Sequence, residues 1–251
     1  MTRLKTANGR ELAYAKLAGK APGVVFLGGF MSDMQGTKAL ALEAWARARG
    51  RAFLRFDYSG HGDSAGAFDE GCIGDWAADA RAAIEALTEG PQVLVGSSMG
   101  GWICAILARE IPEKIAGIVG IAAAPDFTED SMWGGFSPEQ RAELMENGRI
   151  LLPSEYGAPY VITRRLIEDG RAHLVLRDPL PMPFPVRLLQ GSADRDVDMA
   201  VALRLFDHIE AEDLRLTVVK GADHRFSSPE CLGLIEESVE QVLAAAGGGA
   251  P

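Results

Sequence analysis

Ser98 is the residue whose surroundings point most clearly to chemistry. It lies at the centre of the run Gly-Ser-Ser-Met-Gly (96–100), which fits the pattern G-x-S-x-G and stands where the apolar run QVLVGSS gives way to a helical pattern. A serine on such a sharp strand-to-helix turn presents its hydroxyl as a nucleophile, and the N–H of the next residue points into a site for an oxyanion. Ser97 lacks the flanking glycines of the motif, two residues away on each side, so we expect a structural role for it.

A serine hydroxyl needs a base that removes its proton. The chain contains four histidines, which are His61, His173, His208 and His224. When a nucleophile sits on this kind of turn, the acid and then the histidine follow it in the chain. This order favours His224, in the run GADHRF after the last strand pattern. We expect His208 on a helix surface, His173 in an inserted segment, and His61 in a loop that precedes the nucleophile.

The acid of such a constellation orients the histidine and stabilises its charged form. Asp194, in the run GSADRDV, comes directly after the apolar run VRLLQGS and is the acid that we expect beside His224. Asp196 and Asp198 are close alternatives, and Asp126 follows an earlier strand pattern. The carboxylates that do not act as the acid would be solvated loop residues or helix caps.

An oxyanion site needs two N–H donors held in place before the reaction. The N–H of Met99, directly after the nucleophile, is the first. The second is expected from Phe30, in the loop after GVVFLGG, where Gly28 and Gly29 permit close approach of the backbone.

The elements that must hold these residues are apolar strand patterns alternating with helical patterns. Continuous apolar runs are typical of strands buried on both faces, and strands that alternate with helices form parallel sheets covered on both sides. We therefore expect an α/β fold with a mostly parallel sheet of about eight strands flanked by helices. The expected strands are 11–18, 23–29, 52–58, 92–98, 115–124, 186–192 and 214–221, and the expected helices between them include 36–49, 75–88 and 99–110.

One segment, about 125–185, contains no convincing buried strand, and we interpret it as a helical cap inserted in the sheet domain. The run SPEQRAELMENGRI predicts a helix with Ser137 as its N-cap, and EYGAPYVITRRLIEDG predicts a second helix that ends at Gly170. Insertions of this kind often cover active sites. The alternative is a peripheral excursion that contacts no substrate.

The substrate pocket is the least determined part of the site. We expect Met31, Trp133 and Phe136 to bind substrate, and Met132 and Tyr160 could also line an apolar acyl site; whether the aromatics form pocket or core stays open. Three arginines could meet an acidic leaving group such as a glucuronate, although a solvated surface is the simpler interpretation: Arg149, Arg164 and Arg165.

Composition excludes several classes of function. The formal charge of −10 argues against nucleic acid as a partner, because phosphate neutralisation needs clustered Lys and Arg. No apolar run reaches the ~18 residues of a membrane span. We find no metal-ligand cluster, phosphate loop or dinucleotide fingerprint, and expect neither metal nor cofactor. Three widely spaced cysteines and an N-terminus without a signal peptide predict a cytoplasmic protein. We expect one domain over 1–251, with a flexible tail at 244–251.

Taken together, the runs GSSMGGW, FDYSGHGDSAGAF, RLLQGSADRDV and GADHRF resemble the α/β-hydrolase superfamily over nearly the whole chain. More narrowly, TKALALEAWARARGRAFLRFDYSGHG and EGPQVLVGSSMGGW resemble a mitochondrial family of palmitoyl-protein thioesterases and acyl-glucuronide esterases. The resemblance implies Ser98, Asp194 and His224 as the triad, an acyl-enzyme mechanism and no cofactor. Many superfamily members have His-Gly at the end of the oxyanion strand, where this chain has Gly28-Gly29.

The function expected from these features is that of a serine hydrolase, an esterase or thioesterase acting on a small-molecule ester, an acyl thioester or an S-acylated protein. A C–C bond hydrolase would use the same triad and remains an alternative, as do a non-catalytic ligand-binding relative and a scaffolding protein with incidental esterase activity. The sequence leaves the acyl chain length, the leaving group and the oligomeric state open.

Overall fold

The structure is a computed structural model, and it describes residues 2–152 and 159–247. These residues form one eight-stranded sheet in the order β1-β2-β4-β3-β5-β6-β10-β12 and two sheets of two strands each. In the large sheet β1, β2 and β4 pair antiparallel, and every pair from β4 to β12 is parallel. The expected α/β fold with a mostly parallel sheet is confirmed. The eight strands are Thr2–Lys5 (β1), Glu11–Leu17 (β2), Lys20–Leu27 (β3), Arg51–Phe56 (β4), Gln92–Ser97 (β5), Ile115–Ile121 (β6), Val186–Gly191 (β10) and Leu214–Val219 (β12).

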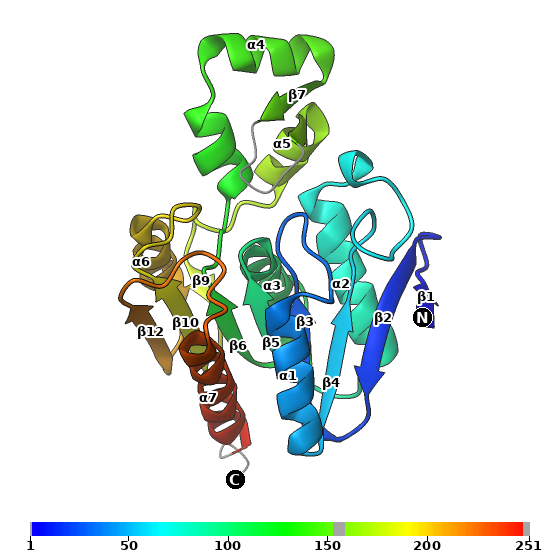
Figure 1. The fold of residues 1–251 in the computed structure, drawn as a ribbon, viewed down its shortest axis with the longest axis vertical. Coiled ribbons are helices and arrows are strands. Elements are labelled where there is room, and N and C mark those ends of the chain that lie inside the picture. The colour runs from blue at the N-terminus through cyan, green and yellow to red at the C-terminus, as the bar shows by residue number, and fades with distance from the viewer. Residues whose placement is uncertain (1, 153–158, 248–251) are drawn as a thin grey trace.

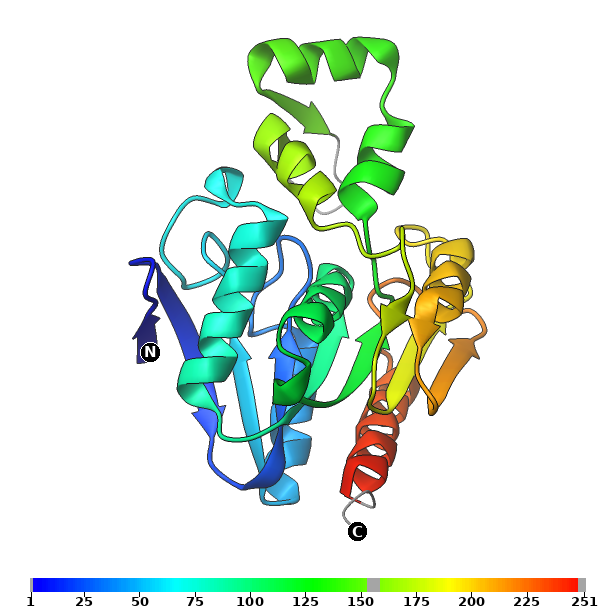
Figure 2. The same ribbon diagram turned by 180° about the vertical axis from the view of Figure 1, so that it is seen from behind.

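Helices cover both faces of this sheet, as Figures 1 and 2 show from opposite sides. Every residue of β5 and β10 is buried, as expected for central strands covered on both faces, and the buried residues include the polar side chains of Gln92, Arg187 and Gln190. At the edge, β12 contains half-buried and exposed residues only. One face carries α1 (Thr37–Ala48) and α7 (Pro229–Gly247), and the other carries α2 (Ile73–Leu87), α3 (Met99–Glu110) and α6 (Met199–His208).

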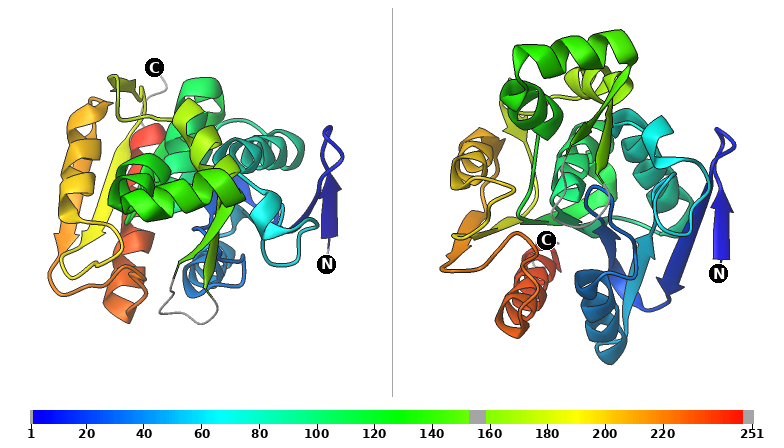
Figure 3. Two further views of the ribbon diagram at one scale, coloured as in Figure 1. Left: turned by 90° about the horizontal axis from the view of Figure 1, so that it is seen from above. Right: turned by 45° about the horizontal axis from the view of Figure 1, so that its top comes forward.

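The segment between β6 and β10 forms the cap, which lies beyond the edge of the sheet where the parallel strands end (Figures 1 and 3). It begins with the π-helix η3 (Thr128–Trp133) and α4 (Pro138–Asn147). A hairpin of β7 (Arg149–Leu152) and β8 (Tyr160–Thr163) follows, then α5 (Arg164–Ala172). The remaining short elements are the 3-10 turns η1 (Phe68–Glu70) and η2 (Pro112–Lys114) and the paired strands β9 (Leu180–Pro181) and β11 (Ile209–Glu210).

The first cap helix begins as its sequence predicts. The Ser137 hydroxyl accepts a hydrogen bond from the N–H of Gln140, and the Gln140 side chain accepts one from the N–H of Ser137. This reciprocal pair satisfies two N–H groups that the helix itself leaves without partners.

Two expectations for secondary structure are wrong. Of the second cap helix, expected over 155–170, the described part from Tyr160 to Thr163 is a strand, and α5 starts only at Arg164 and continues to Ala172. The β-branched run Val-Ile-Thr suits a strand, and Arg149–Leu152 supplies its partner. Helix α7 also continues to Gly247, because three consecutive alanines favour helix, so the tail expected from 244 is wrong for 244–247. The rest of that tail, 248–251, lies outside the described residues.

Candidate active site

Ser98 occupies the strained turn that its motif predicts. It joins the end of β5 to the start of α3 with φ 54° and ψ −118°, a backbone conformation that residues other than glycine rarely adopt. Its N–H donates a hydrogen bond to the carbonyl of Ile121 at 2.9 Å, which ties the turn to the neighbouring strand. The surrounding sheet therefore holds the turn in a conformation that would be unfavourable in isolation.

The glycines on either side of this turn are required by close approach of the backbone. A Cβ on Gly96 would collide with the carbonyl oxygen of Gly100, and a Cβ on Gly100 would collide with the carbonyl of Leu27 in β3. Small residues at both ends are therefore a steric condition for placing Ser98 at this edge of the sheet.

The structure brings Ser98, His224 and Asp194 together, from three different loops. Nε2 of His224 lies 3.1 Å from Oγ of Ser98, and Nδ1 lies 2.9 Å from Oδ2 of Asp194. An ionised carboxylate can only accept a hydrogen bond, so Nδ1 of His224 carries the proton and donates a hydrogen bond to Asp194. Nε2 is then the acceptor for the Ser98 hydroxyl, which is the arrangement that a general base needs.

Asp194 is fixed by more than the histidine. Its side chain is 1% exposed. Oδ1 accepts from the N–H groups of Asp196 and Val197, both at 2.9 Å, and Oδ2 accepts from Nε2 of Gln190 at 3.1 Å. Burial by itself would raise the pKa of Asp194, but the hydrogen bonds from His224 and the backbone outweigh it and lower the pKa below its usual range. Asp194 is therefore an ionised acceptor at neutral pH.

The same groups could be considered as metal ligands, because ligand atoms of Asp194, Asp196 and His224 lie within 4.8 Å of one another. Both oxygens of Asp194 already accept hydrogen bonds from protein donors, however, and Nδ1 of His224 is one of these donors. The contacts that exist orient a histidine, and this is the function that we assign to the group.

The alternative acids have other partners. Asp198 caps α6 by accepting from the N–H of Ala200 at 2.7 Å. Asp126 is fully buried at the base of the cap, where its carboxylate accepts from the N–H groups of Val175 at 2.8 Å and Leu176 at 2.9 Å. Asp126 thus joins the two chain segments that enter and leave the cap.

The other histidines also have partners away from Ser98. Nδ1 of His208 lies 2.9 Å from the carbonyl of Arg204 within α6, and Nε2 of His173 lies 3.7 Å from Asp169 in the cap. His61 is 4% exposed, and its Nε2 accepts a hydrogen bond from the N–H of Met31 at 3.3 Å.

The two expected oxyanion donors belong to two chain segments that both adjoin Ser98. Met99 is the first residue of α3, so its N–H has no partner inside the helix. The loop that carries Phe30 runs against the nucleophile, because a Cβ on Gly29 would lie 3.4 Å from Cβ of Ser98. The hydroxyl of Tyr58 donates a 3.4 Å hydrogen bond to the carbonyl of Gly28, which ties down the start of this loop.

The ring of Phe30 is the centre of an aromatic cluster that sequence reasoning missed in part. Its neighbours come from the loop before α2, from α2 itself, from the entry to the cap and from β8, which carries the Tyr160 already considered. The centroid distances from Phe30 are 4.9 Å to Phe68, 6.0 Å to Trp76, 5.6 Å to Phe127 and 6.1 Å to Tyr160. The cluster joins the cap to the loop beside Ser98 and makes this region apolar.

Of the residues expected to bind substrate, only Met31 belongs to the loop beside Ser98, and 46% of its surface is exposed. Trp133 is contacted by the guanidinium groups of Arg141 and Arg171, at 5.2 and 4.7 Å from its ring centroid. Phe136 is 7% exposed and lies 6.4 Å from Trp133. The structure thus gives Trp133 and Phe136 packing partners within the cap, and their contact with substrate remains a prediction.

The three cap arginines considered for an acidic leaving group each have an acidic neighbour. These pairs are Arg149 with Asp69 at 3.9 Å, Arg164 with Glu168 at 3.1 Å and Arg165 with Asp75 at 2.7 Å. The last pair joins the cap to α2. Recognition of a glucuronate by these side chains would therefore have to compete with existing ion pairs.

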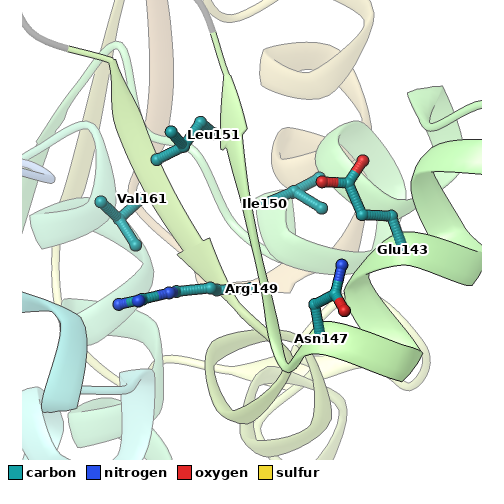
Figure 4. Close-up of a pocket in the computed structure, with 6 residues that line it drawn as sticks. All are labelled: Glu143, Asn147, Arg149, Ile150, Leu151 and Val161. Carbon is teal, nitrogen blue, oxygen red and sulfur yellow. The ribbon is translucent and has the colours of Figure 1, made fainter.

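A cavity of about 600 Å³ lies on the cap, between α4 and the hairpin. Figure 4 shows Leu151 and Val161 side by side on the two strands, with Glu143 and Asn147 projecting from α4. None of the six residues that line it belongs to the triad or to the loop that carries Phe30.

Comparison with known proteins decides the family. A family profile described as alpha/beta hydrolase fold matches residues 24–146. Human mitochondrial palmitoyl-protein thioesterase ABHD10 is 36% identical over 235 residues, which are 93% of this chain and 76% of that protein. This chain belongs to the α/β-hydrolase family.

Solved structures of other α/β hydrolases superpose over nearly the whole chain. A putative hydrolase from Agrobacterium vitis S4 has a TM-score of 0.92 and 39% identity, over 96% of this chain and 97% of the other. Mouse alpha/beta hydrolase domain-containing protein 10 has a TM-score of 0.90 and 35% identity, over 97% and 98%. This α/β hydrolase is therefore homologous to a thioesterase. In the part of the chain that the structure describes, no helix combines the length and apolarity needed to cross a membrane.

Proposed function

We propose that this α/β hydrolase cleaves carboxylic esters or thioesters through an acyl-enzyme intermediate on Ser98. The observation that carries the proposal is the chain of contacts from Oγ of Ser98 through His224 to Asp194, at 3.1 and 2.9 Å. The strained turn and the buried, ionised acid add the preorganisation that nucleophilic catalysis requires.

In the first half of the reaction, Nε2 of His224 takes the proton from Ser98 while Oγ attacks the acyl carbonyl. The charge that develops on the carbonyl oxygen is stabilised by the N–H groups of Phe30 and Met99. His224, held in its charged form by Asp194, then gives the proton to the leaving alcohol or thiol, and the C–O or C–S bond breaks. The product of this half is an ester between the acyl group and Ser98.

In the second half, His224 takes a proton from water, and the resulting hydroxide equivalent attacks the acyl-enzyme. The tetrahedral intermediate collapses, the acid leaves, and the proton returns to Oγ of Ser98. Each step uses groups that the chain itself supplies, so we propose that the reaction needs neither metal nor cofactor.

An apolar acyl group is the substrate feature that the site favours. The rings around Phe30 make the surface beside Ser98 apolar, and the relatives named above include a palmitoyl-protein thioesterase. We therefore propose acyl esters or thioesters, from small molecules or S-acylated proteins, ahead of cleavage of C–C bonds. A cytoplasmic location stays a prediction from the sequence.

The test is a comparison of kcat/KM for p-nitrophenyl esters from acetate to palmitate, together with palmitoyl-CoA and an acyl glucuronide. Ser98→Ala is the negative control, and Ser97→Ala is a matched control for a neighbouring hydroxyl. We expect a rise in kcat/KM with chain length or with the thioester, and loss of activity in Ser98→Ala only. A short-chain optimum would restrict the function to small carboxylic esters, and equal activity of Ser98→Ala and wild type would overturn the proposal.

A further inference from the structure

His61 precedes the nucleophile in the chain and takes no part in the triad, yet it lies against the loop that supplies an oxyanion donor. His61 is almost fully buried, with 4% of its surface exposed. Nε2 of His61 lies 3.3 Å from the backbone nitrogen of Met31. Met31 directly follows Phe30, whose N–H is the second donor of the proposed oxyanion site.

The surroundings of His61 settle which nitrogen carries its proton. Nδ1 lies 3.3 Å from the carbonyl oxygen of Ser59, which can only accept, so Nδ1 is the donor. Nε2 then offers a lone pair to the N–H of Met31. Burial lowers the pKa of His61 to about 4, so the ring is neutral, with this acceptor available, at neutral pH. Three aromatic side chains hold the ring in place, with centroids at 5.5, 5.0 and 5.0 Å: Tyr58, Phe68 and Trp76.

The loop needs such an anchor at this point. Met31 has φ 56°, which is unfavourable for a residue other than glycine, and nearly half of its surface is exposed. Farther along, the N–H of Met34 donates to Oδ1 of Asp57 at 2.6 Å. Before it, the hydroxyl of Ser32 donates to the carbonyl of Gly29 at 2.9 Å. The hydrogen bond from the N–H of Met31 to His61 is made one residue away from Phe30. It fixes the orientation of the peptide group between Phe30 and Met31.

We propose that His61 is a positioning residue for the oxyanion site: it holds the backbone at Met31 so that the N–H of Phe30 points at the carbonyl oxygen of the substrate. This inference rests on the proposed function. The rate depends on donors that are already oriented when charge develops, whereas the neutral carbonyl of the bound substrate uses them less. Loss of the His61 acceptor should therefore lower kcat and leave KM nearly unchanged.

The decisive pair of variants is His61→Phe and His61→Gln. Phenylalanine keeps the ring and its aromatic contacts but has no acceptor, while glutamine has a carbonyl oxygen at about the reach of Nε2. Removal of a whole oxyanion donor lowers kcat by about 10²–10³-fold, so a loosened donor should lower it by roughly 10–100-fold. We expect that loss in His61→Phe, with KM within about threefold of wild type, and recovery of most of kcat in His61→Gln.

Binding of an alkyl trifluoromethyl ketone separates positioning from general stability. This probe adds to Ser98 and places a negative oxygen in the oxyanion site, so its affinity should fall in His61→Phe by the same factor as kcat. The control is His208→Gln, a substitution at the end of α6 that should change neither quantity. Thermal unfolding of all variants checks that each is folded at the assay temperature.

The outcomes separate the two proposals. Wild-type kcat and inhibitor affinity in folded His61→Phe, with Ser98→Ala inactive, would overturn the positioning role and leave the proposed function intact. A higher KM with unchanged kcat in His61→Phe would overturn the positioning role as well. Activity of Ser98→Ala equal to wild type would instead overturn the proposed function.

Discussion

The side chain of Gln190 donates a hydrogen bond to Oδ2 of Asp194, the same oxygen that accepts from Nδ1 of His224. Gln190 is 1% exposed and is the next-to-last residue of β10, and its Nε2 also lies 3.0 Å from the carbonyl of Val197. The acid of the proposed triad is therefore oriented from the sheet as well as from its own loop.

Substitution Gln190→Leu should lower kcat by about 3–10-fold, because one neutral hydrogen bond to the acid is lost, worth about 1 kcal/mol. The matched control is Gln92→Leu, since Gln92 is equally buried but lies at the opposite end of the sheet and binds the carbonyls of Glu89 and Gly90. Both variants should be destabilised, and only the first should lose kcat in steady-state kinetics. An equal loss of kcat in both would show that the effect is one of stability.

Replacement of the acid itself should have a far larger effect. In Asp194→Asn the side chain no longer stabilises the charged histidine, and we expect kcat to fall by about 10³–10⁴-fold. Asp198→Asn is the control, because asparagine caps a helix as well as aspartate does and the carboxylate of Asp198 bonds to the N–H of Ala200. Near-normal kcat in Asp194→Asn, measured on a short p-nitrophenyl ester, would remove Asp194 from the mechanism.

Asp126 should contribute to stability and not to chemistry. Asp126→Ala leaves two buried N–H groups without their acceptor, those of Val175 and Leu176, and should lower the free energy of unfolding by about 3 kcal/mol. Asp130→Ala removes a partly exposed partner of Arg177 and Arg204 and should cost less than about 1 kcal/mol. Urea unfolding measures the free energy of unfolding of both variants. Similar losses would argue against a stabilising role of Asp126 where the chain enters and leaves the cap.

The buried His61 predicts a specific dependence of stability on pH. Its pKa in the folded protein, about 4, lies below its ordinary value of 6.5, because burial disfavours the charged form. Between these values the unfolded chain binds the proton and the folded protein does not, so stability is complete above pH 6.5 and falls as the pH drops toward 4.

At pH 4.5 the free energy of unfolding of wild type should be lower than at pH 7 by roughly 2 kcal/mol because of this group alone. The variant His61→Phe should not show this loss. Urea unfolding of both proteins at the two pH values measures the difference, in which the contributions of shared groups cancel. Identical pH dependence of wild type and variant would mean that His61 is not buried as a neutral ring.

The sheet and the meeting of Ser98, Asp194 and His224 could be predicted because each depends on local pattern and chain order. Strand β5, the turn at Ser98 and helix α3 follow one another within a few residues, and Asp194 and His224 each follow directly on a strand of the sheet. Parallel strands end at a common edge, so order alone brings these loops together.

What could not be predicted depends on contacts between distant segments. Strand β8 was expected as helix, since its pairing with β7 is not visible in its own sequence, and the short polar strand β1 was not expected at all. Gln190 did leave a signal: it is an uncharged polar residue in the otherwise apolar end of a buried strand. The contact of His61 with Met31 left none, because it joins two irregular loops.

Covalent labelling tests the central claim most directly. Wild-type protein would be treated with a fluorophosphonate, and the adduct located by intact mass and peptide mapping, beside Ser98→Ala, Ser97→Ala and His224→Ala. The account predicts one adduct per chain on Ser98, unchanged labelling in Ser97→Ala, none in Ser98→Ala and labelling slowed by orders of magnitude in His224→Ala. An adduct on another residue, or labelling of Ser98→Ala at the wild-type rate, would contradict it.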